Sequence, residues 1–358
     1  MNAAILPYLA SPTSHKPLEL TAPDQLREVN GTEVFPIVEG IPLLQPPGQF
    51  AECYNETLEL IFQERSFETF ARIWPPNGDD GATTPDQVLR DEYGPNGIRE
   101  AFQRYAGLSL EQRMRGFVHV AAPQRSTEHP LVQQRAIESR RRYAELSYSE
   151  GHAEKLWGQK STWASYLSDY AAAMLTDGPQ IIVELGTGAG LGTNALIETG
   201  LDSARLITID VDYACIGNAQ GLARVYRVQE RVDGIVASFW FLPLSDNSIN
   251  VVCSHYGIDE SREASRVIDE IARVLHQDGR FVAVCRTDAA SRLALHLEPL
   301  GFDKQEMGRL ARMANLYAGT DSLIETAEGK GLRLEKRQTT EPESGHQRDL
   351  LVFRKVKL

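Results

Sequence analysis

Residues Ile181–Thr193 read IIVELGTGAGLGT, and the expected fold of the chain follows from this stretch. Its apolar start, Ile181–Val183, runs into an acidic residue and then into glycines at alternate positions. An apolar run without polar alternation is typical of a parallel strand that is buried on both faces, and glycines directly after it let a ligand approach the main chain. Residues Asn194–Thr199 have helical character, and Gly200 can end that helix. The stretch therefore predicts a strand, a glycine turn and a helix.

The spacing of the glycines indicates which nucleotide the turn fits. A dinucleotide fingerprint, G-x-G-x-x-G, needs a glycine where the chain has Leu191 if counted from Gly186, or Thr193 if counted from Gly188. The chain instead reads E-x-G-x-G-x-G, with Glu184 two residues before the first glycine. A carboxylate there would repel a pyrophosphate, but it could hold a cation or accept hydrogen bonds from amino and hydroxyl groups.

An acid followed by G-x-G-x-G resembles the first motif of the class I S-adenosylmethionine-dependent methyltransferases. The resemblance implies an α/β fold: a doubly wound, mostly parallel, seven-stranded Rossmann-like sheet with an antiparallel last strand. It also implies S-adenosylmethionine as cofactor and S-adenosylhomocysteine as product. With the motifs that follow along the chain, the expected cofactor-binding residues are Glu184, Gly186, Thr187, Gly188, Gly190, Asp210, Val211, Ser238, Phe239 and Ser254.

A second buried strand, Arg205–Asp212, reads RLITIDVD and ends in acid. Asp210 lies twenty residues after Gly190, where a nucleoside-binding α/β sheet needs a carboxylate to accept both ribose hydroxyls. The alternative is that Asp210 caps the helix beginning near Tyr213, but Asp212 fits that role better. We therefore expect Asp210 to bind the ribose.

The run LPLSDNSINVV, residues 242–252, resembles the methyltransferase segment L-P-F-x-D-x-S-F-D-V-V. In that family an acid shortly before L-P holds the adenine amino group; Ser238 stands there and can still accept one hydrogen bond, without charge assistance. Phe239 or Trp240 could stack on the adenine or simply pack in the core. Asn250 replaces the family's acid before the fourth strand.

The fourth strand, Val251–Ser254, ends in His255 and Tyr256. Ligands of open α/β sheets bind beyond the carboxyl ends of the strands, so these side chains should face the methyl acceptor. His255 is the candidate general base because an unperturbed imidazole has a pKa near neutrality. It could instead only orient the acceptor or cap the next helix. Tyr256 is the expected positioning partner.

The segment Glu263–His276 has one apolar face at helical spacing and is expected to lie on the sheet. Its end and the following residues, EIARVLHQDGRFVAV, closely resemble the family's passage R-V-L-x-x-G-G into a fifth strand, here Phe281–Cys285. Leu332–Gln338 and Asp349–Val356 are predicted to form a final antiparallel hairpin.

We expect three parts: a ribbon-like module at 1–48, a helical cap or linker region at 49–160, and the cofactor-binding domain at 161–358. A helical insertion at about 288–319 would overhang the acceptor site as a lid. Four aromatic or imidazole side chains near the domain boundary could contact the acceptor, although packing is the simpler interpretation of each. They are Tyr148, His152, Trp157 and Trp163.

Residues Leu9–Leu44 resemble the small zinc-ribbon-like domain that accompanies many methyltransferases, as a fused module or as a separate activator subunit. Two C-x-x-C pairs often hold zinc in that family; the corresponding positions here are Ser11 and Ser14 and, approximately, Arg27 and Asn30. None of these can replace a thiolate ligand, so the module is expected to fold without metal. It either caps the main domain or contacts substrate directly.

The composition limits the possible binding partners and the cellular compartment of the protein. The 358 residues carry a net charge of −12, which disfavours a nucleic-acid surface. No apolar stretch approaches a membrane span, and the start has no signal-like pattern, so we expect a cytoplasmic protein without a membrane partner. The scattered cysteines suit a reduced compartment and predict no metal site. They are Cys53, Cys215, Cys253 and Cys285.

The sequence thus predicts transfer of a methyl group from S-adenosylmethionine to an unidentified acceptor. A small molecule is favoured and a protein is the alternative acceptor; the oligomeric state is not indicated. Two other functions remain open. A catalytically silent scaffold would explain the missing cysteines, Ser238 and Asn250, whereas a nicotinamide-dependent oxidoreductase conflicts with Leu191 and with the terminal hairpin.

Overall fold

The structure is a computed structural model. It describes residues 1–38, 40–45, 164–175, 178, 180–188, 190–201, 203–211, 213–261, 264–287, 319–340 and 347–357. The predicted helical region at 49–160 and nearly all of the predicted insertion, up to residue 318, lie outside these residues, as do the four candidates Tyr148, His152, Trp157 and Trp163.

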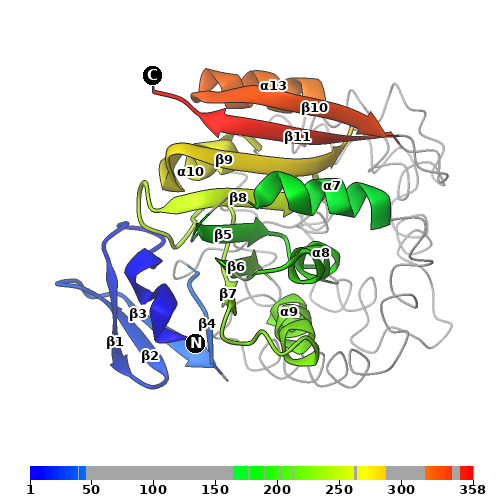
Figure 1. Cartoon of the computed structure of the whole chain (residues 1–358). Coiled ribbons are helices and arrows are strands. Elements are labelled where there is room, and N and C mark those ends of the chain that lie inside the picture. Colours follow the sequence, from blue (N-terminus) through cyan, green and yellow to red (C-terminus); the bar gives the residue numbers. More distant parts are fainter. Residues whose placement is uncertain are drawn as a thin grey trace, which may run out of the picture.

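Within the described residues, a seven-stranded sheet has the strand order β10-β11-β9-β8-β5-β6-β7 (Figure 1). The neighbours from β9 to β7 are parallel, and β11 is antiparallel to both β9 and β10. This confirms the predicted mostly parallel sheet and its antiparallel final hairpin. The strands are β5 (Gln180–Leu185), β6 (Ala204–Asp210), β7 (Val232–Val236), β8 (Ile249–His255), β9 (Leu275–Arg286), β10 (Leu332–Thr340) and β11 (Arg348–Lys355).

Successive apolar residues of β5 enter different halves of the core. Ile182 packs with Leu206 on one face of the sheet, and Val183 packs with Ile207 on the other. All four side chains are fully buried. Burying a side chain of this size contributes about 1.5–3 kcal/mol, so both faces need helices over them. The run in the sequence is therefore apolar because both faces of β5 are buried, as expected.

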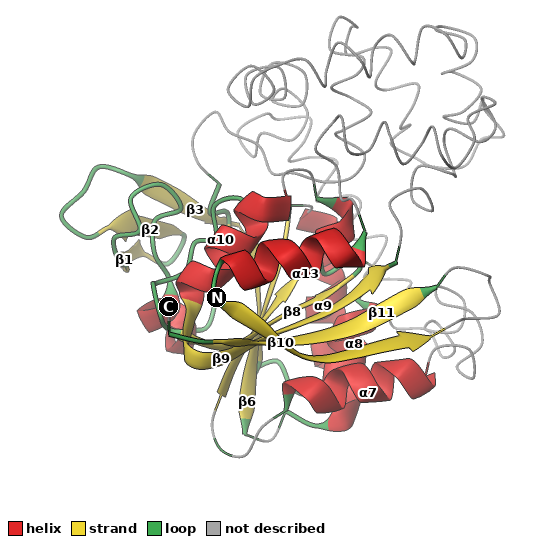
Figure 2. Cartoon of the chain, turned by 90° about the horizontal axis from the view of Figure 1, so that it is seen from above, coloured by secondary structure: helices red, strands yellow, loops and turns green. Residues whose placement is uncertain are grey.

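Helices α7 (Ala164–Met174), α8 (Leu191–Thr199) and α9 (Tyr213–Val225) cover the Ile182 face. Helices α10 (Ala264–Val274) and α13 (Thr320–Gly329) cover the Val183 face, as Figure 2 shows. Two predicted boundaries are wrong. Helix α8 begins earlier than Asn194, because Gly190 caps it in a left-handed conformation. Helix α10 ends before His276, because Leu275 already pairs with Ile249 as the first residue of β9.

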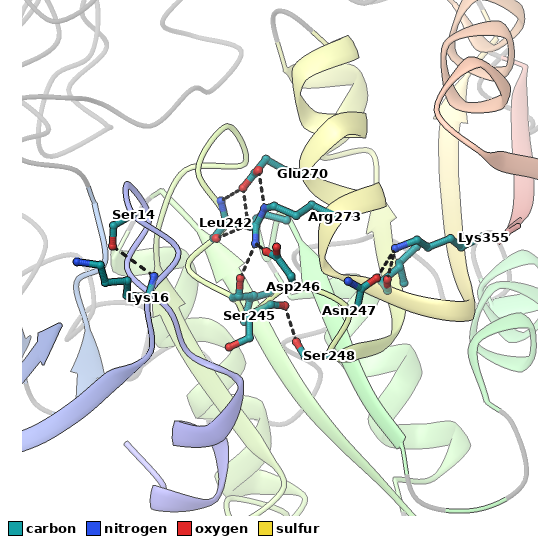
Figure 3. Close-up of polar contacts among 12 residues, drawn as sticks. Ser14, Lys16, Leu242, Ser245, Asp246, Asn247, Ser248, Glu270, Arg273 and Lys355 are labelled. Carbon is teal, nitrogen blue, oxygen red and sulfur yellow. Dashed lines mark hydrogen bonds and ion pairs between the residues drawn. The ribbon is translucent and has the colours of Figure 1, made fainter. Parts of the chain in front are cut away.

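Arg273, in the last turn of α10, joins two of the motifs that the sequence placed apart (Figure 3). Its guanidinium donates hydrogen bonds to the carbonyl oxygens of Leu242 (2.9 Å) and Leu244 (2.7 Å) and to the carboxylates of Asp246 (2.7 Å) and Glu270 (2.7 Å). Glu270 in turn accepts the Leu242 N–H at 2.7 Å. The R-V-L helix and the L-P-L-S-D turn are therefore one hydrogen-bonded unit.

The N-terminal residues form a 3₁₀ helix, η1 (Ala3–Tyr8), and a four-stranded antiparallel sheet. Its strands are β1 (Leu18–Ala22), β2 (Gln25–Glu28), β3 (Val34–Val38) and β4 (Ile41–Pro42). The module packs beside β7: the Leu44 N–H donates to the Val236 carbonyl at 2.9 Å, and the fully buried Ile5 and Leu9 share a core with Leu242. It thus covers the edge of the main sheet, which would otherwise be open to pairing with other chains.

Ser11 and Ser14, where the resemblance to zinc-ribbon-like modules would place cysteines, belong to a polar cluster. Ser11 donates a hydrogen bond to Glu33, and Ser14 donates to Glu28 at 2.8 Å. Lys16 forms an ion pair with Glu28 at 2.8 Å. Hydrogen bonds and an ion pair thus join residues 11–16 to residues 28–33 within the module. In the described part of the chain, no group of three or more His, Cys, Asp or Glu side chains could hold a metal ion.

Candidate active site

The glycine loop between β5 and α8 leaves its main chain uncovered. Gly188 and Gly190 have φ angles of +49° and +85°, a region that favours glycine. A Cβ atom added at Gly188 would meet nothing within 4 Å, so open space lies beside the loop. No side chain caps the N-terminus of α8 at Gly190. Main-chain N–H groups at a helix start are suited to polar or anionic ligand atoms.

Glu184 lies beneath this loop and is fully buried. Its Oε2 accepts hydrogen bonds from Thr193 (2.6 Å) and Thr208 (2.7 Å), whereas Oε1 has no hydrogen-bond partner. A Cβ at residue 192 would come within 2.4 Å of Oε1, so Gly192 is needed beside the carboxylate. Burial raises the pKa of Glu184 to about 7, against the hydrogen bonds from the two threonines that lower it. An orphaned, buried acceptor of this kind fits an amino group or a cation.

The raised pKa of Glu184 predicts a pH-dependent stability. Between about pH 4.5 and about pH 7 the folded protein holds a proton on this carboxyl that the unfolded chain has lost. The free energy of unfolding should therefore fall as the pH rises from about 4.5 to about 7, by on the order of 3 kcal/mol, and level off at higher pH. Urea unfolding of the cofactor-free protein at several pH values measures this fall. The Glu184→Gln variant should lack it; an identical pH profile in wild type and variant would contradict the assignment.

Asp210, at the end of β6, contacts the loop directly. Its Oδ2 accepts the Gly188 N–H at 3.0 Å, so the two motifs that the sequence separates meet at adjacent strand ends. Beneath them, the hydroxyls of Thr187 and Thr208 are 2.5 Å apart. Val211 follows Asp210 and is partly exposed. The structure therefore groups these predicted residues around one main-chain turn.

The turn after β7 contributes buried side chains rather than uncovered main chain. Ser238 is fully buried, and its Oγ accepts the Trp240 N–H at 3.0 Å. Phe239 lies against the loop, with its Cζ 3.6 Å from where a Cβ on Gly186 would be. Trp240 is buried in the core, with the guanidinium of Arg266 5.5 Å from its ring centroid. Core packing therefore accounts for Trp240, whereas Phe239 borders the predicted cofactor site.

The ends of β5 and β8 approach each other closely. Ser254 donates to the Leu185 carbonyl at 2.9 Å and accepts the Ile258 N–H at 3.0 Å. A Cβ on Gly257 would lie 2.4 Å from the Leu185 carbonyl oxygen. This is the point where the strand order reverses, the usual ligand site of open α/β sheets. Ser254 braces this turn, and its predicted contact with the cofactor stays a prediction.

His255 is enclosed by aromatic rings, and the expectation of a near-neutral pKa is wrong. Its Nε2 lies 3.1 Å from the Tyr166 hydroxyl. Burial and the nearby guanidinium groups of Arg348 and Arg286 lower the pKa of His255 to about 3. It is therefore a neutral, weakly basic imidazole near pH 7. The rings around it, with centroids 4.6–5.8 Å away, are those of Tyr166, Tyr170 and Tyr256.

Tyr256 has a φ of +61°, unusual for a residue with a side chain. Such a conformation costs about 1–2 kcal/mol and persists where the surroundings hold it. The Tyr256 hydroxyl accepts a hydrogen bond from Arg348 at 3.1 Å, and the Arg286 guanidinium lies 4.6 Å from its ring centroid. Burial raises the pKa of Tyr256, so its hydroxyl stays protonated. The predicted pair, His255 and Tyr256, is thus one cluster with two arginines.

Four members of this cluster were not predicted from the sequence. Tyr166 and Tyr170 come from α7, before the first strand of the sheet, and Arg286 and Arg348 end β9 and begin β11. No local spacing marks them. Only the antiparallel register, which pairs Arg348 with Arg286, brings the last strand's first residue to the carboxyl end of the parallel strands.

Parts of the chain are similar to known proteins. Residues 183–283 match the family model described as "Methyltransferase domain". No curated protein sequence matches the chain. None of the helices in the described part of the chain has the length and apolarity of a membrane-spanning helix.

Among solved structures, the chain is similar to the [4+2]-cyclase SpnF (16% identity, TM-score 0.42, covering 54% of this chain and 82% of that chain). It is also similar to a Haloferax volcanii complex of the Trm112 methyltransferase activator with a protein described as a methyltransferase. The identity is 16% and the TM-score 0.44, and the match covers 57% of this chain and 95% of that chain. A third similar structure is that of geranyl diphosphate C-methyltransferase from Streptomyces coelicolor A3(2), with S-adenosylhomocysteine. The identity is 12% and the TM-score 0.44, and the match covers 58% of this chain and 85% of that chain.

The residues present fit the cofactor that the family implies. The open space beside Gly188 and the carboxylate of Asp210 suit a nucleoside, and the orphaned Glu184 Oε1 suits a positively charged group. Residues 183–283 thus match a methyltransferase domain, and the side chains of the glycine loop and of the neighbouring strand ends fit S-adenosylmethionine as its cofactor.

Proposed function

We propose that the enzyme methylates a small molecule that is already nucleophilic when it binds. The observation that carries this proposal is the contact of Asp210 with Gly188 beside open space, next to an acceptor cluster that offers no strong base. His255 has a pKa of about 3, and burial raises the pKa values of Tyr166 and Tyr256. None of these groups readily takes a proton near pH 7.

In this proposal the predicted residues divide into two sets. Asp210 accepts the ribose hydroxyls, and Glu184 and the loop of Gly186, Thr187, Gly188 and Gly190 bind the rest of the cofactor. Val211, Ser238, Phe239 and Ser254 line or brace its site. His255 and Tyr256 position the acceptor on the other side.

When bound, S-adenosylmethionine supplies an electrophilic methyl group on a cationic sulfur. The acceptor atom forms a bond to that carbon while the carbon–sulfur bond breaks, and the electron pair stays on sulfur. Such a step disperses charge, so alignment and exclusion of water matter more than proton transfer. The partly buried ring cluster around His255 can supply both, because its aromatic rings exclude water and its hydroxyl and guanidinium groups fix the acceptor's position.

The domain boundaries and the compartment belong to the same proposal. We assign residues 1–48 to the ribbon-like module, 49–160 to a helical cap and 161–358 to the catalytic domain, with an insertion at about 288–319. The net charge of −12 supports a small acceptor over a nucleic acid. In the described part of the chain, Cys215, Cys253 and Cys285 form no disulfide bond, which supports a cytoplasmic location.

Labelled methyl transfer tests the proposal. The full chain is incubated with methyl-labelled S-adenosylmethionine and with separate metabolite, protein and RNA fractions of a cell extract. We expect label in the metabolite fraction and preferential binding of S-adenosylhomocysteine over NAD by calorimetry. Label in RNA would overturn the acceptor class. Tight cofactor binding without any transfer would support the silent scaffold instead.

A further inference from the structure

Arg348 is a buried cation at the carboxyl end of the parallel strands. It begins β11, opposite Arg286, and is 9% exposed. Among the described residues it forms no ion pair with a carboxylate, and its Nε has no hydrogen-bond partner. Burying a guanidinium without an opposite charge costs several kcal/mol, so such a group is uncommon unless something compensates it.

The neighbours of Arg348 orient it but do not neutralise it. Its Nη1 donates to the Tyr256 hydroxyl at 3.1 Å, and its guanidinium carbon lies 3.8 Å from the ring centroid of Tyr166. The Tyr166 hydroxyl is itself engaged with His255 at 3.1 Å. Stacking on an aromatic ring and one hydrogen bond to a neutral hydroxyl fix the plane of the guanidinium. Its positive charge remains.

The charges around the cluster leave one positive charge. Arg286 forms an ion pair with Asp259 at 3.0 Å, so these two cancel. His255 is neutral because its pKa is lowered to about 3, and Tyr166 and Tyr256 are neutral because burial raises their pKa values. Among the described residues of this cluster, the unbalanced charge is therefore that of Arg348.

The cluster also adjoins the predicted cofactor site. The Cβ of His255 is 3.4 Å from where a Cβ on Gly192 would lie, and the orphaned oxygen of Glu184 is 2.4 Å from the same point. Gly257, directly after Tyr256, is in close main-chain contact with Gly186. A group held by Arg348 would thus belong to a molecule positioned beside the glycine loop.

We propose that Arg348 binds a carboxylate group of the methyl acceptor, with Tyr166 and Tyr256 beside it. The inference rests on the proposed function and specifies its substrate class. A carboxylate is planar and matches the guanidinium fork, and its single negative charge equals the single unbalanced positive charge. A phosphate group, at about −1.5 to −2 near pH 7, would exceed that charge.

Matched probes test the subsite without knowledge of the acceptor. Benzoate and benzamide have nearly the same shape, but only benzoate is charged. Each is titrated into the full-length protein by calorimetry, with and without saturating S-adenosylhomocysteine. We expect benzoate to bind at least tenfold more tightly than benzamide. In Arg348→Met the benzoate affinity should fall at least tenfold, and in Arg348→Lys it should fall less, because the charge remains but the fork is lost.

Arg354 supplies the control variant. It lies on the same strand at the opposite end of the sheet and pairs with Glu335 at 2.6 Å. Arg354→Met should keep the wild-type affinity for benzoate. The affinity for S-adenosylhomocysteine should stay within about threefold in all three variants.

Several outcomes would overturn the inference: equal affinities of the wild type for benzoate and benzamide, no benzoate binding, equal benzoate binding by Arg348→Met, or tighter binding of inorganic phosphate. The wild-type comparison decides even if the methionine variant does not fold. Loss of S-adenosylhomocysteine binding by the wild type would count against the proposed function, whereas failure of benzoate alone would count only against the subsite.

Discussion

Replacing Asp210 with alanine is expected to lower the affinity for S-adenosylhomocysteine at least a hundredfold. In the proposed site its carboxylate accepts both ribose hydroxyls, and hydrogen bonds to a charged group contribute about 1.5–3 kcal/mol each. Two such bonds correspond to a factor of about 100 or more, since 1.4 kcal/mol is tenfold. The variant also removes the acceptor of the Gly188 N–H, so the glycine loop loses its link to β6. Calorimetric titration of the full chain measures the loss.

Two further variants separate binding from folding. Asp210→Asn keeps the shape and one acceptor oxygen, so its affinity should lie between those of wild type and alanine variant. Asp269→Asn is the control: this aspartate is about half exposed on α10, pairs with Lys330 and should leave the affinity unchanged. If Asp210→Ala bound S-adenosylhomocysteine within threefold of wild type, while unfolding at the same urea concentration, the ribose assignment would be wrong.

The fold was predictable from the sequence because its strongest signals are local. The run Ile181–Val183 is apolar at every position because both faces of β5 are covered. The apolar face of α10 contains the buried residues Val267, Ile268 and Ile271, at the helical spacing expected of a helix on a sheet. Helix ends were less predictable, because Leu275 suits an apolar helix face and an apolar strand equally well.

The acceptor cluster could not be predicted, because its members come from distant elements. Tyr166 precedes the first strand, and Arg348 begins the last one. The sequence supplies the intrinsic pKa of His255 but not the rings and guanidinium groups that surround it. Its near-neutral pKa was therefore predicted from the isolated side chain, and the fold lowers it.

The environment of Glu184 was only partly predictable from the sequence. Its position at the end of the first strand follows from the motif, but the prediction of a ligand-facing carboxylate did not include Thr193 and Thr208, which bind one of its oxygens. The structure leaves the other oxygen for a ligand or for a proton. A carboxyl with a pKa of about 7 can change its charge when a cationic cofactor binds. The pH dependence proposed for Glu184 follows from its burial, which the motif alone does not show.

Replacing Arg273 with methionine is expected to lower the free energy of unfolding by about 3 kcal/mol or more. The variant keeps an unbranched apolar chain but leaves Glu270 buried, at 9% exposure, without its cation. Removing one partner of a buried ion pair typically costs about 3–5 kcal/mol, because the remaining charge is uncompensated. The carbonyl oxygens of Leu242 and Leu244 also lose their donor. Urea unfolding followed by circular dichroism measures the change.

Comparison variants show whether the network, rather than any arginine, is responsible. Arg333 is 64% exposed, and its nearest carboxylate oxygen, on Glu335, is 3.9 Å away, so Arg333→Met should change stability by less than about 0.5 kcal/mol. Arg273→Lys keeps a positive charge for Glu270, but its ammonium group cannot reach every acceptor. Its loss of stability should therefore lie between those of Arg273→Met and Arg333→Met. A loss below about 1 kcal/mol in Arg273→Met would contradict the proposed role. The expected loss instead gives a physical reason for the two separated motifs: the arginine of R-V-L holds the turn that L-P-L-S-D forms.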